Sequence, residues 1–78
     1  RIYGALSRCC VVVVGAGETG RLLAQHFAGH YPQRLVVLNR SIEKAQALAR
    51  ELGGEAHPLD QLPELLRVAN VVATAVRS

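Results

Sequence analysis

The 78-residue sequence contains no tryptophan and no methionine, and its only aromatic residues are Tyr3, Phe27 and Tyr31. So few aromatic side chains provide no platform on which bases could stack, which argues against a nucleic-acid-binding surface. The net charge of +3 is mild. It favours a polyanionic ligand without indicating a nucleic-acid partner. Long apolar runs are also missing, and the longest, at residues 9–14, is far too short to cross a membrane.

Cysteine and histidine are scarce too. Cys9 and Cys10 are adjacent, and neighbouring cysteines rarely bridge each other. We interpret them as buried thiols in a reducing cytosol rather than as a reactive or metal-binding pair, and we expect a cytoplasmic protein. His26, His30 and His57 are too dispersed for a recognisable metal site. No Ser/His/Asp or Cys/His arrangement emerges, so we assign no catalytic residue and no metal ligand.

The length allows one small domain. Half of the residues are hydrophobic, which suits a globular fold. The chain begins at an arginine and stops just after an apolar run, so we expect a piece of a longer protein. Residues 1–8 have no clear pattern and are interpreted as a connection from an upstream part. Residues 9–78 are expected to form the domain.

Short apolar runs alternate with helical patterns along the rest of the chain. Strands are predicted at residues 9–14, 35–38, 55–59 and 71–76, with Pro58 limiting the third. The first helix, from residue 18 to about 29, is expected to turn one apolar face inward, formed by Leu22, Leu23, His26 and Phe27.

The two later helices have predicted start signals. Ser41 is expected to be the N-cap of a helix that Gly53 and Gly54 end. Asp60 is expected to cap a short helix with Pro63 in its first turn. The β-α-β-α-β-α-β order predicts an α/β, Rossmann-like three-layer fold with a parallel sheet of about four strands, a truncated dinucleotide-binding domain.

A glycine-rich turn, G-x-G-x-x-G, follows the first strand and opens the first helix. In this setting Gly15 permits the tight turn, Gly17 has no side chain to block a pyrophosphate, and Gly20 allows close helix–sheet packing. The backbone N–H groups at the helix start then face the phosphates. Binding is therefore assigned to six consecutive residues: Gly15, Ala16, Gly17, Glu18, Thr19 and Gly20. A packing turn without ligand is the alternative.

The end of the second strand indicates which cofactor binds. An NAD site usually has Asp or Glu there, whereas this sequence has Asn39, Arg40 and Ser41. Asn39 does not repel a 2′-phosphate, Arg40 can place a planar cation on it, and Ser41 can donate a hydrogen bond. The sequence therefore predicts NADP(H). The alternative is that Arg40 is a solvated cation and Ser41 only a cap.

Three stretches, GAGETGRLLAQHF, LNRSIEKAQALARELGG and PLDQLPELLRVANVVATAV, resemble the NADP-binding domain of the glutamyl-tRNA reductase family. The resemblance covers about residues 11 to 76. The shikimate dehydrogenase family shares the N-R-[TS] element, but its turn typically reads G-A-G-G-A, so Glu18 and Thr19 favour the reductase. The positions that match the family pattern in order are Glu18, Asn39, Arg40, Ser41, Glu43, Lys44, Ala45, Leu48 and Ala49.

The resemblance implies an oxidoreductase that uses NADPH to reduce glutamyl-tRNA to glutamate-1-semialdehyde, the entry to tetrapyrrole and porphyrin biosynthesis. It implies a catalytic cysteine and tRNA contacts on domains outside this chain, and a homodimer in the full-length protein. Cys9 and Cys10 do not take that catalytic role, so the fragment alone is expected to be inactive.

Two departures and three open assignments remain. The last strand begins Ala69-Asn70 where the family has Ala-Asp, and it is poor in hydroxyls, which leaves Thr74 as a possible cofactor contact or a packing residue. Glu18 either contacts a neighbouring domain or is a simple N-terminal charge. Arg21 either reaches the cofactor phosphates or faces solvent. Alternatives for the whole chain are a shikimate dehydrogenase-like NADP domain and a nucleotide-sensing module without chemistry.

Overall fold

The computed structural model describes residues 9–15 and 17–74 of the chain. Its described strands are β1 (Cys10–Val14), β2 (Arg34–Asn39), β3 (Glu55–Pro58) and β4 (Val71–Thr74). They form one sheet in the order β3-β2-β1-β4, and every neighbouring pair is parallel. The predicted Rossmann-like α/β fold with four strands is therefore confirmed. The predicted connection at residues 1–8 lies outside the described residues.

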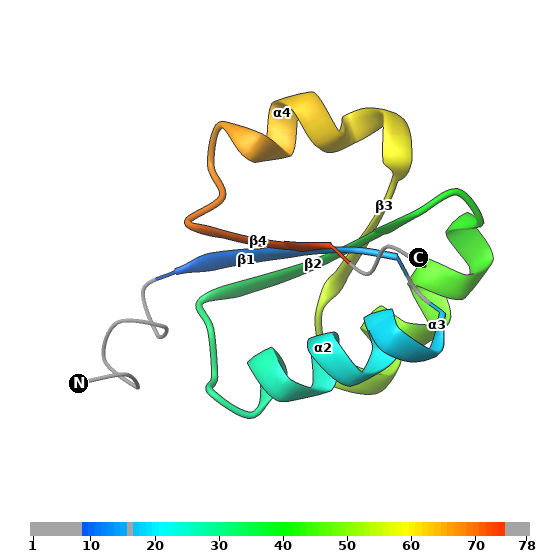
Figure 1. Ribbon diagram of the computed structural model, residues 1–78, viewed down its shortest axis with the longest axis horizontal. Helices are drawn as coiled ribbons and strands as arrows, with labels where there is room; N and C mark the ends of the chain where they lie inside the picture. The colour runs from blue at the N-terminus through cyan, green and yellow to red at the C-terminus, as the bar shows by residue number, and fades with distance from the viewer. Residues whose placement is uncertain (1–8, 16, 75–78) are drawn as a thin grey trace.

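The helices form the two outer layers of a three-layer arrangement. They are α2 (Glu18–Ala28), α3 (Ile42–Leu52) and α4 (Leu62–Leu66), the last preceded by the short 3-10 helix η1 (Leu59–Gln61). Figure 1 shows α2 and α3 on one face of the sheet and α4 on the other. The chain therefore changes faces between β2 and β4, with β1 in the middle of the sheet.

The two central strands make the core because they are buried on both faces. Val11 and Val13 pack toward α2 and α3, whereas Val12 packs in a second cluster with Leu65 of α4. All three valines are completely buried. Alternate side chains of a strand point to opposite faces, so a strand covered on both sides needs apolar residues at every position. The uninterrupted valine run meets that requirement.

The packing face of α2 agrees only in part with the predicted one. Leu22 is 61% exposed and His26 is exposed, whereas Gly20 and Ala24 are buried and Leu23 is half-buried. Small residues spaced four apart let the helix approach the sheet closely. That close approach rotates the larger Leu22 away from the core. The predicted face is therefore confirmed for Leu23 and Phe27, which pack against the core, and is wrong for Leu22 and His26, which are exposed.

One predicted helix start is confirmed and the other is wrong. The Ser41 hydroxyl caps α3 by accepting a hydrogen bond from the backbone N–H of Lys44, and Gly53 ends the helix with a positive φ of 72°. Asp60 does not cap α4, because it lies inside η1 and Gln61 takes the N-cap position. Pro63 does lie in the first turn, as predicted.

Arg34 and Glu55 join the amino-terminal ends of β2 and β3. The Arg34 guanidinium donates two hydrogen bonds to the Glu55 carboxylate, at 2.6 and 2.8 Å. His57 lies 3.2 Å from the same carboxylate. The hydrogen bond from Arg34 is the main cause that lowers the pKa of Glu55 from 4.5 to about 2.

Glu55→Gln should therefore destabilise the domain in a pH-dependent way. At neutral pH we expect a loss of at most about 1 kcal/mol in the free energy of unfolding, because the pair is partly exposed. The lowered pKa of Glu55 means that its contribution is fully present above about pH 4.5 and is lost as the pH falls through about 2. Urea unfolding of wild type, Glu55→Gln and the control Glu64→Gln across this range tests the prediction. A Glu55→Gln deficit independent of pH would contradict it.

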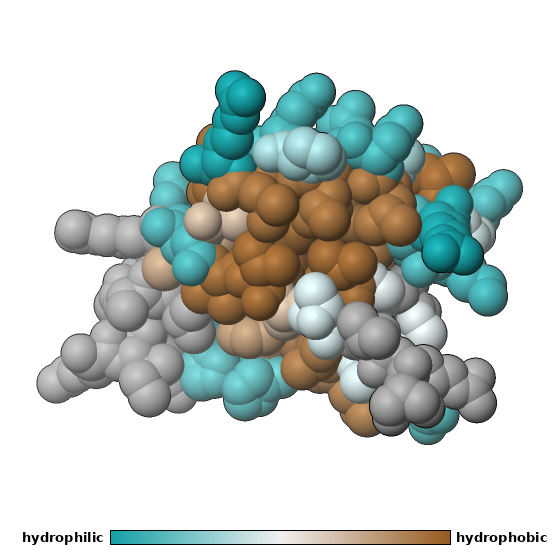
Figure 2. Space-filling model, turned by 45° about the horizontal axis from the view of Figure 1, so that its top comes forward, coloured by the Kyte–Doolittle hydropathy of each residue, from teal (hydrophilic) through white to brown (hydrophobic). Residues whose placement is uncertain are grey.

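Large apolar side chains remain exposed on the α4 side of β4. Leu66, Val68 and Val72 are 42 to 52% exposed. Figure 2, with the α4 side turned forward, shows apolar residues gathered there. β4, which carries Val72, is an edge strand of the described sheet.

Candidate functional site

The predicted site residues gather at the carboxyl-terminal edge of the sheet. Val14, the last residue of β1, pairs with Leu38 of β2 on one side and with Thr74 of β4 on the other. Gly15 and Asn39 each come one residue later, so both lie at this edge with Thr74. The strand order reverses beside β1, because β2 and β3 lie on one side of it and β4 on the other, and α2 and α4 cover opposite faces (Figure 1). Ligands of open α/β sheets bind in such a crevice.

The first turn after β1 has the conformation predicted from its glycine. Gly15 has a φ of 107°, in the region that favours glycine, and its N–H donates a 2.7 Å hydrogen bond to the carbonyl of Leu38. Gly20 is buried on the face of α2 that packs on the sheet. Ala16 lies outside the described residues.

Gly17 is a glycine that the fold itself does not require. It is the exposed N-cap of α2, with an ordinary φ of −76°, and a Cβ built on it meets nothing within 4 Å. Glu18 and Thr19 follow it, also exposed. The first N–H groups of a helix have no intrahelical acceptor, and glycine offers no side chain to bind them. The turn therefore presents free donors and open space on the solvent side.

The loop after β2 is organised by hydrogen bonds of its own. The Asn39 side-chain amide donates to the backbone carbonyl of Ser41 at 3.3 Å. This bond closes the loop around Arg40, which is exposed and makes no ion pair among the described residues. The Ser41 hydroxyl accepts from the Lys44 N–H at 3.5 Å and donates to the Glu43 carboxylate at 3.1 Å.

Glu43 contacts Ser41, a predicted site residue, although sequence reasoning did not assign Glu43 to the site. Glu43 is one of the positions that match the family pattern, which by itself indicates no contact for this residue. A serine cap with glutamate three positions later is the usual sign of a carboxylate at a helix start. Here the glutamate comes two positions after Ser41, so that signal was absent.

Arg21 does not point to the phosphate region. Its guanidinium pairs with the carboxylate of Glu51 on α3 at 2.5 Å, and Gln25 donates to the same carboxylate. The pair links α2 to α3 on the outer surface. Of the two readings of Arg21, the structure therefore favours the solvent-facing one.

Asn70, the residue before β4, binds the start of β1 through both its side chain and its backbone. The Asn70 side-chain oxygen accepts from the N–H of Cys10 at 2.9 Å, and the Asn70 N–H donates to the Cys10 carbonyl at the same distance. These two bonds join the residue before β4 to the first residue of β1. Thr74 is exposed at the end of β4.

The histidines and cysteines form no metal site and no disulfide in the part of the chain that the structure describes. His26 packs edge-on against the ring of His30, with ring centroids 5.1 Å apart, and His57 adjoins Glu55. No group of three metal-ligating side chains occurs among the described residues. Cys10 is buried, and within residues 9–15 and 17–74 it forms no disulfide with Cys9.

Among the described helices, none has the length and apolar character that crossing a membrane requires.

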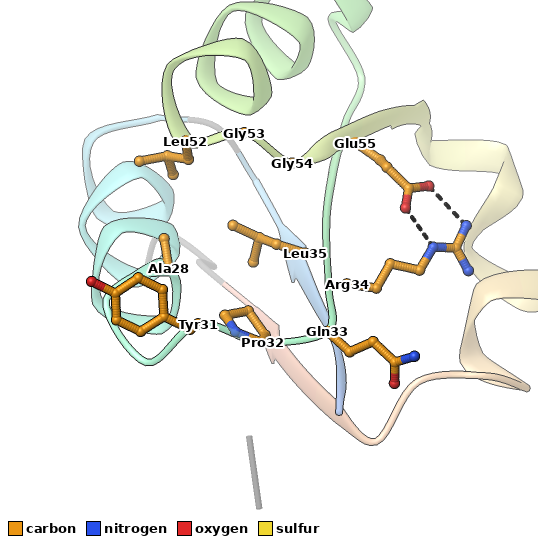
Figure 3. A pocket seen from close by; sticks show the side chains of 10 residues that line it. All are labelled: Ala28, Tyr31, Pro32, Gln33, Arg34, Leu35, Leu52, Gly53, Gly54 and Glu55. Carbon is orange, nitrogen blue, oxygen red and sulfur yellow. Dashed lines mark hydrogen bonds and ion pairs between the residues drawn. The ribbon is translucent and has the colours of Figure 1, made fainter. Parts of the chain in front are cut away.

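A hollow of about 250 Å³ lies at the opposite edge of the sheet, where β2 and β3 begin (Figure 3). Tyr31, Leu35 and Leu52 line it, and none of the predicted site residues does. The guanidinium at its rim, that of Arg34, is already paired with Glu55. We therefore do not regard this hollow as the phosphate site, which needs free donors.

The model of the shikimate/quinate 5-dehydrogenase family matches residues 1–78. The chain belongs to this family. Membership of a dehydrogenase family over the full chain implies a nicotinamide dinucleotide as the class of cofactor.

Three relatives are glutamyl-tRNA reductases. That of Thermus thermophilus is 47% identical over 74 residues, 95% of this chain and 19% of the relative. That of Pseudoalteromonas translucida is 42% identical over 77 residues, 99% of this chain and 18% of the relative. The solved structure from Methanopyrus kandleri superposes with a TM-score of 0.85 at 40% identity, covering 96% of this chain and 19% of that one. The resemblance predicted from the three sequence stretches is confirmed, and the chain spans about a fifth of these relatives.

Proposed function

We propose that this chain is the NADPH-binding domain of a glutamyl-tRNA reductase. The observation that carries the proposal is the position of two unusual features on adjacent strands. The open turn at Gly17 follows β1, and the exposed cation Arg40 follows β2, at one edge of the sheet. The open turn suits a pyrophosphate, and the exposed cation suits a 2′-phosphate.

The residues present fit such a dinucleotide. The uncapped first turn of α2, with Glu18, Thr19 and the space over Gly17, would hold the pyrophosphate through backbone N–H groups. Arg40 and Ser41 would hold the 2′-phosphate, with Asn39 fixing the loop between them. Thr74 would face the nicotinamide half. The bound cofactor supplies a hydride, and these residues orient it.

The reaction belongs to the longer protein. In the proposed parent, NADPH reduces glutamyl-tRNA to glutamate-1-semialdehyde for tetrapyrrole and porphyrin biosynthesis. The names of the relatives support this, and the chain's share of their length leaves room for the catalytic cysteine and the tRNA contacts elsewhere. We further propose that the domain spans residues 9–78 and that the parent is a cytoplasmic homodimer. The buried thiol of Cys10 supports a reducing compartment.

Arg40→Ala should remove the preference for NADP⁺ over NAD⁺. Loss of a charge-assisted bond of about 1.5–3 kcal/mol corresponds to at least a tenfold weaker NADP⁺ affinity. NAD⁺ affinity should stay unchanged. Calorimetric titration of wild type, Arg40→Ala and the control Arg67→Ala with both dinucleotides measures this. Equal affinity of the wild type for NAD⁺ and NADP⁺ would refute the cofactor assignment.

A shikimate dehydrogenase-like parent is the second candidate, because the matching family model is the one for shikimate/quinate 5-dehydrogenase. Its cofactor site would be the same, so the two candidates separate only in the parent. Turnover of glutamyl-tRNA by the parent favours the reductase, and turnover of shikimate favours the alternative. Hydride transfer to either substrate rules out a sensor module.

A further inference from the structure

We propose that Glu43 occupies the 2′-phosphate position when no cofactor is bound, and that it thereby lowers the affinity of the domain for NADP(H). This inference rests on the proposed function and names a residue that tunes it. In this view Glu43 is a specificity-determining residue that acts against the phosphorylated cofactor, opposite in sign to Arg40.

The Ser41 hydroxyl can make only a limited set of hydrogen bonds. A serine hydroxyl has a single proton to donate and two lone pairs that accept. Ser41 already accepts from the Lys44 N–H at 3.5 Å and gives its proton to Glu43 at 3.1 Å. A phosphate oxygen can receive that proton only after the Glu43 carboxylate has given it up.

The negative charge of Glu43 lies where a phosphate would also be stabilised. Glu43 lies in the first turn of α3, where the partial positive charge of the helix start stabilises an anion. Its carboxylate therefore uses the same hydroxyl and the same helix end that would attract a phosphate, with the cations Arg40 and Lys44 adjacent in the sequence. Carboxylate and phosphate are both anionic acceptors, so one substitutes for the other.

Binding of the phosphorylated cofactor must displace this carboxylate and then tolerate its negative charge nearby. Glu43 is exposed, so water and salt screen the repulsion. We therefore expect a modest penalty, roughly threefold to tenfold in affinity at low ionic strength. NAD⁺ has no 2′-phosphate, so its affinity does not carry this penalty.

The test compares Glu43→Gln and Glu43→Ala with wild type in binding to NADP⁺ and to NAD⁺ by calorimetry at low salt. Glutamine removes the charge, and alanine removes both the charge and the acceptor. Both should raise NADP⁺ affinity roughly threefold to tenfold, alanine at least as much as glutamine, and leave NAD⁺ affinity unchanged. Glu64→Ala, a loss of the same charge on α4, should change neither.

The difference between the two cofactors separates this role from a structural one. A general effect on the fold would move both affinities together, and thermal unfolding of each variant checks the fold directly. Unchanged NADP⁺ affinity in both variants, or an equal gain for NAD⁺, overturns the proposal for Glu43. The affinities of the wild type for NADP⁺ and NAD⁺ are measured first. A wild type without preference for NADP⁺ overturns the cofactor assignment itself.

Discussion

Gly17→Asp should leave the domain as stable as the wild type, or more stable, and abolish its binding of NADP⁺. Gly17 is the N-cap of α2, and a Cβ at this position meets nothing within 4 Å. Aspartate is among the best N-cap residues, since its carboxylate accepts from the first N–H groups of the helix. That carboxylate would take the donors meant for the pyrophosphate and would repel it. Like charges brought together cost several kcal/mol, so the affinity should fall about a hundredfold or more.

Thermal unfolding and calorimetric titration of the same preparation measure both halves of this result. Gly17→Ser is the uncharged companion, because serine also caps well and adds a smaller side chain. It should keep the stability and weaken binding less than aspartate does. If Gly17→Asp keeps NADP⁺ affinity within about threefold of wild type, the turn has only a structural role, since a repulsion of several kcal/mol could not go unnoticed.

Gly54→Ala should have the opposite profile, with a large loss of stability. A Cβ at Gly54 would lie 2.7 Å from the backbone carbonyl oxygen of Leu35 and 3.4 Å from the Leu35 Cβ. Gly54 cannot easily move away, because its N–H donates a 2.8 Å hydrogen bond to the carbonyl of Ala49. Overpacking of this kind costs about 1–3 kcal/mol. In a domain of this size each kcal/mol lowers the melting temperature by about 4–8 °C.

Gly29→Ala is the matched control for Gly54→Ala. Gly29 has an ordinary φ of −65°, and its Cβ would lie 3.4 and 3.6 Å from two carbonyl oxygens. Alanine there should change the free energy of unfolding by less than about 1 kcal/mol, in either direction. If Gly54→Ala had the same melting temperature as Gly29→Ala, the backbone between β2 and β3 would have shifted to accommodate the added methyl group.

The parts of the fold that sequence predicted well are those where one local signal suffices. The valine run of β1 can be satisfied only between two covered faces, and Ser41 with Gly53 delimits α3. The orientation of α2 could not be predicted from one local signal. There the packing depends on how closely Gly20 and Ala24 let the helix approach, a distance that residue hydropathy does not contain.

The candidate site divides in the same way. The glycine turn and the loop at Arg40 could be located from motifs, because strand ends of a parallel sheet meet at one edge. The hydrogen bond from Ser41 to Glu43 could not, since it depends on a side-chain rotamer two positions beyond the cap. The predicted Asp60 cap also depended on a local feature that the sequence does not signal. The chain winds into η1 before α4 begins, and neither Pro58 nor Pro63 signals that extra turn.

The strand order also decides when both edges of β1 become paired during synthesis. Of the described strands, β1 is the first to leave the ribosome. It lies between β2 and β4, so one of its edges stays open until the last described strand emerges. Until then its valines form an apolar, uncharged β-segment of the kind that aggregates. We therefore expect nascent chains stalled before Val71 to need chaperones that shield exposed strands, whereas chains released after β4 should need them far less.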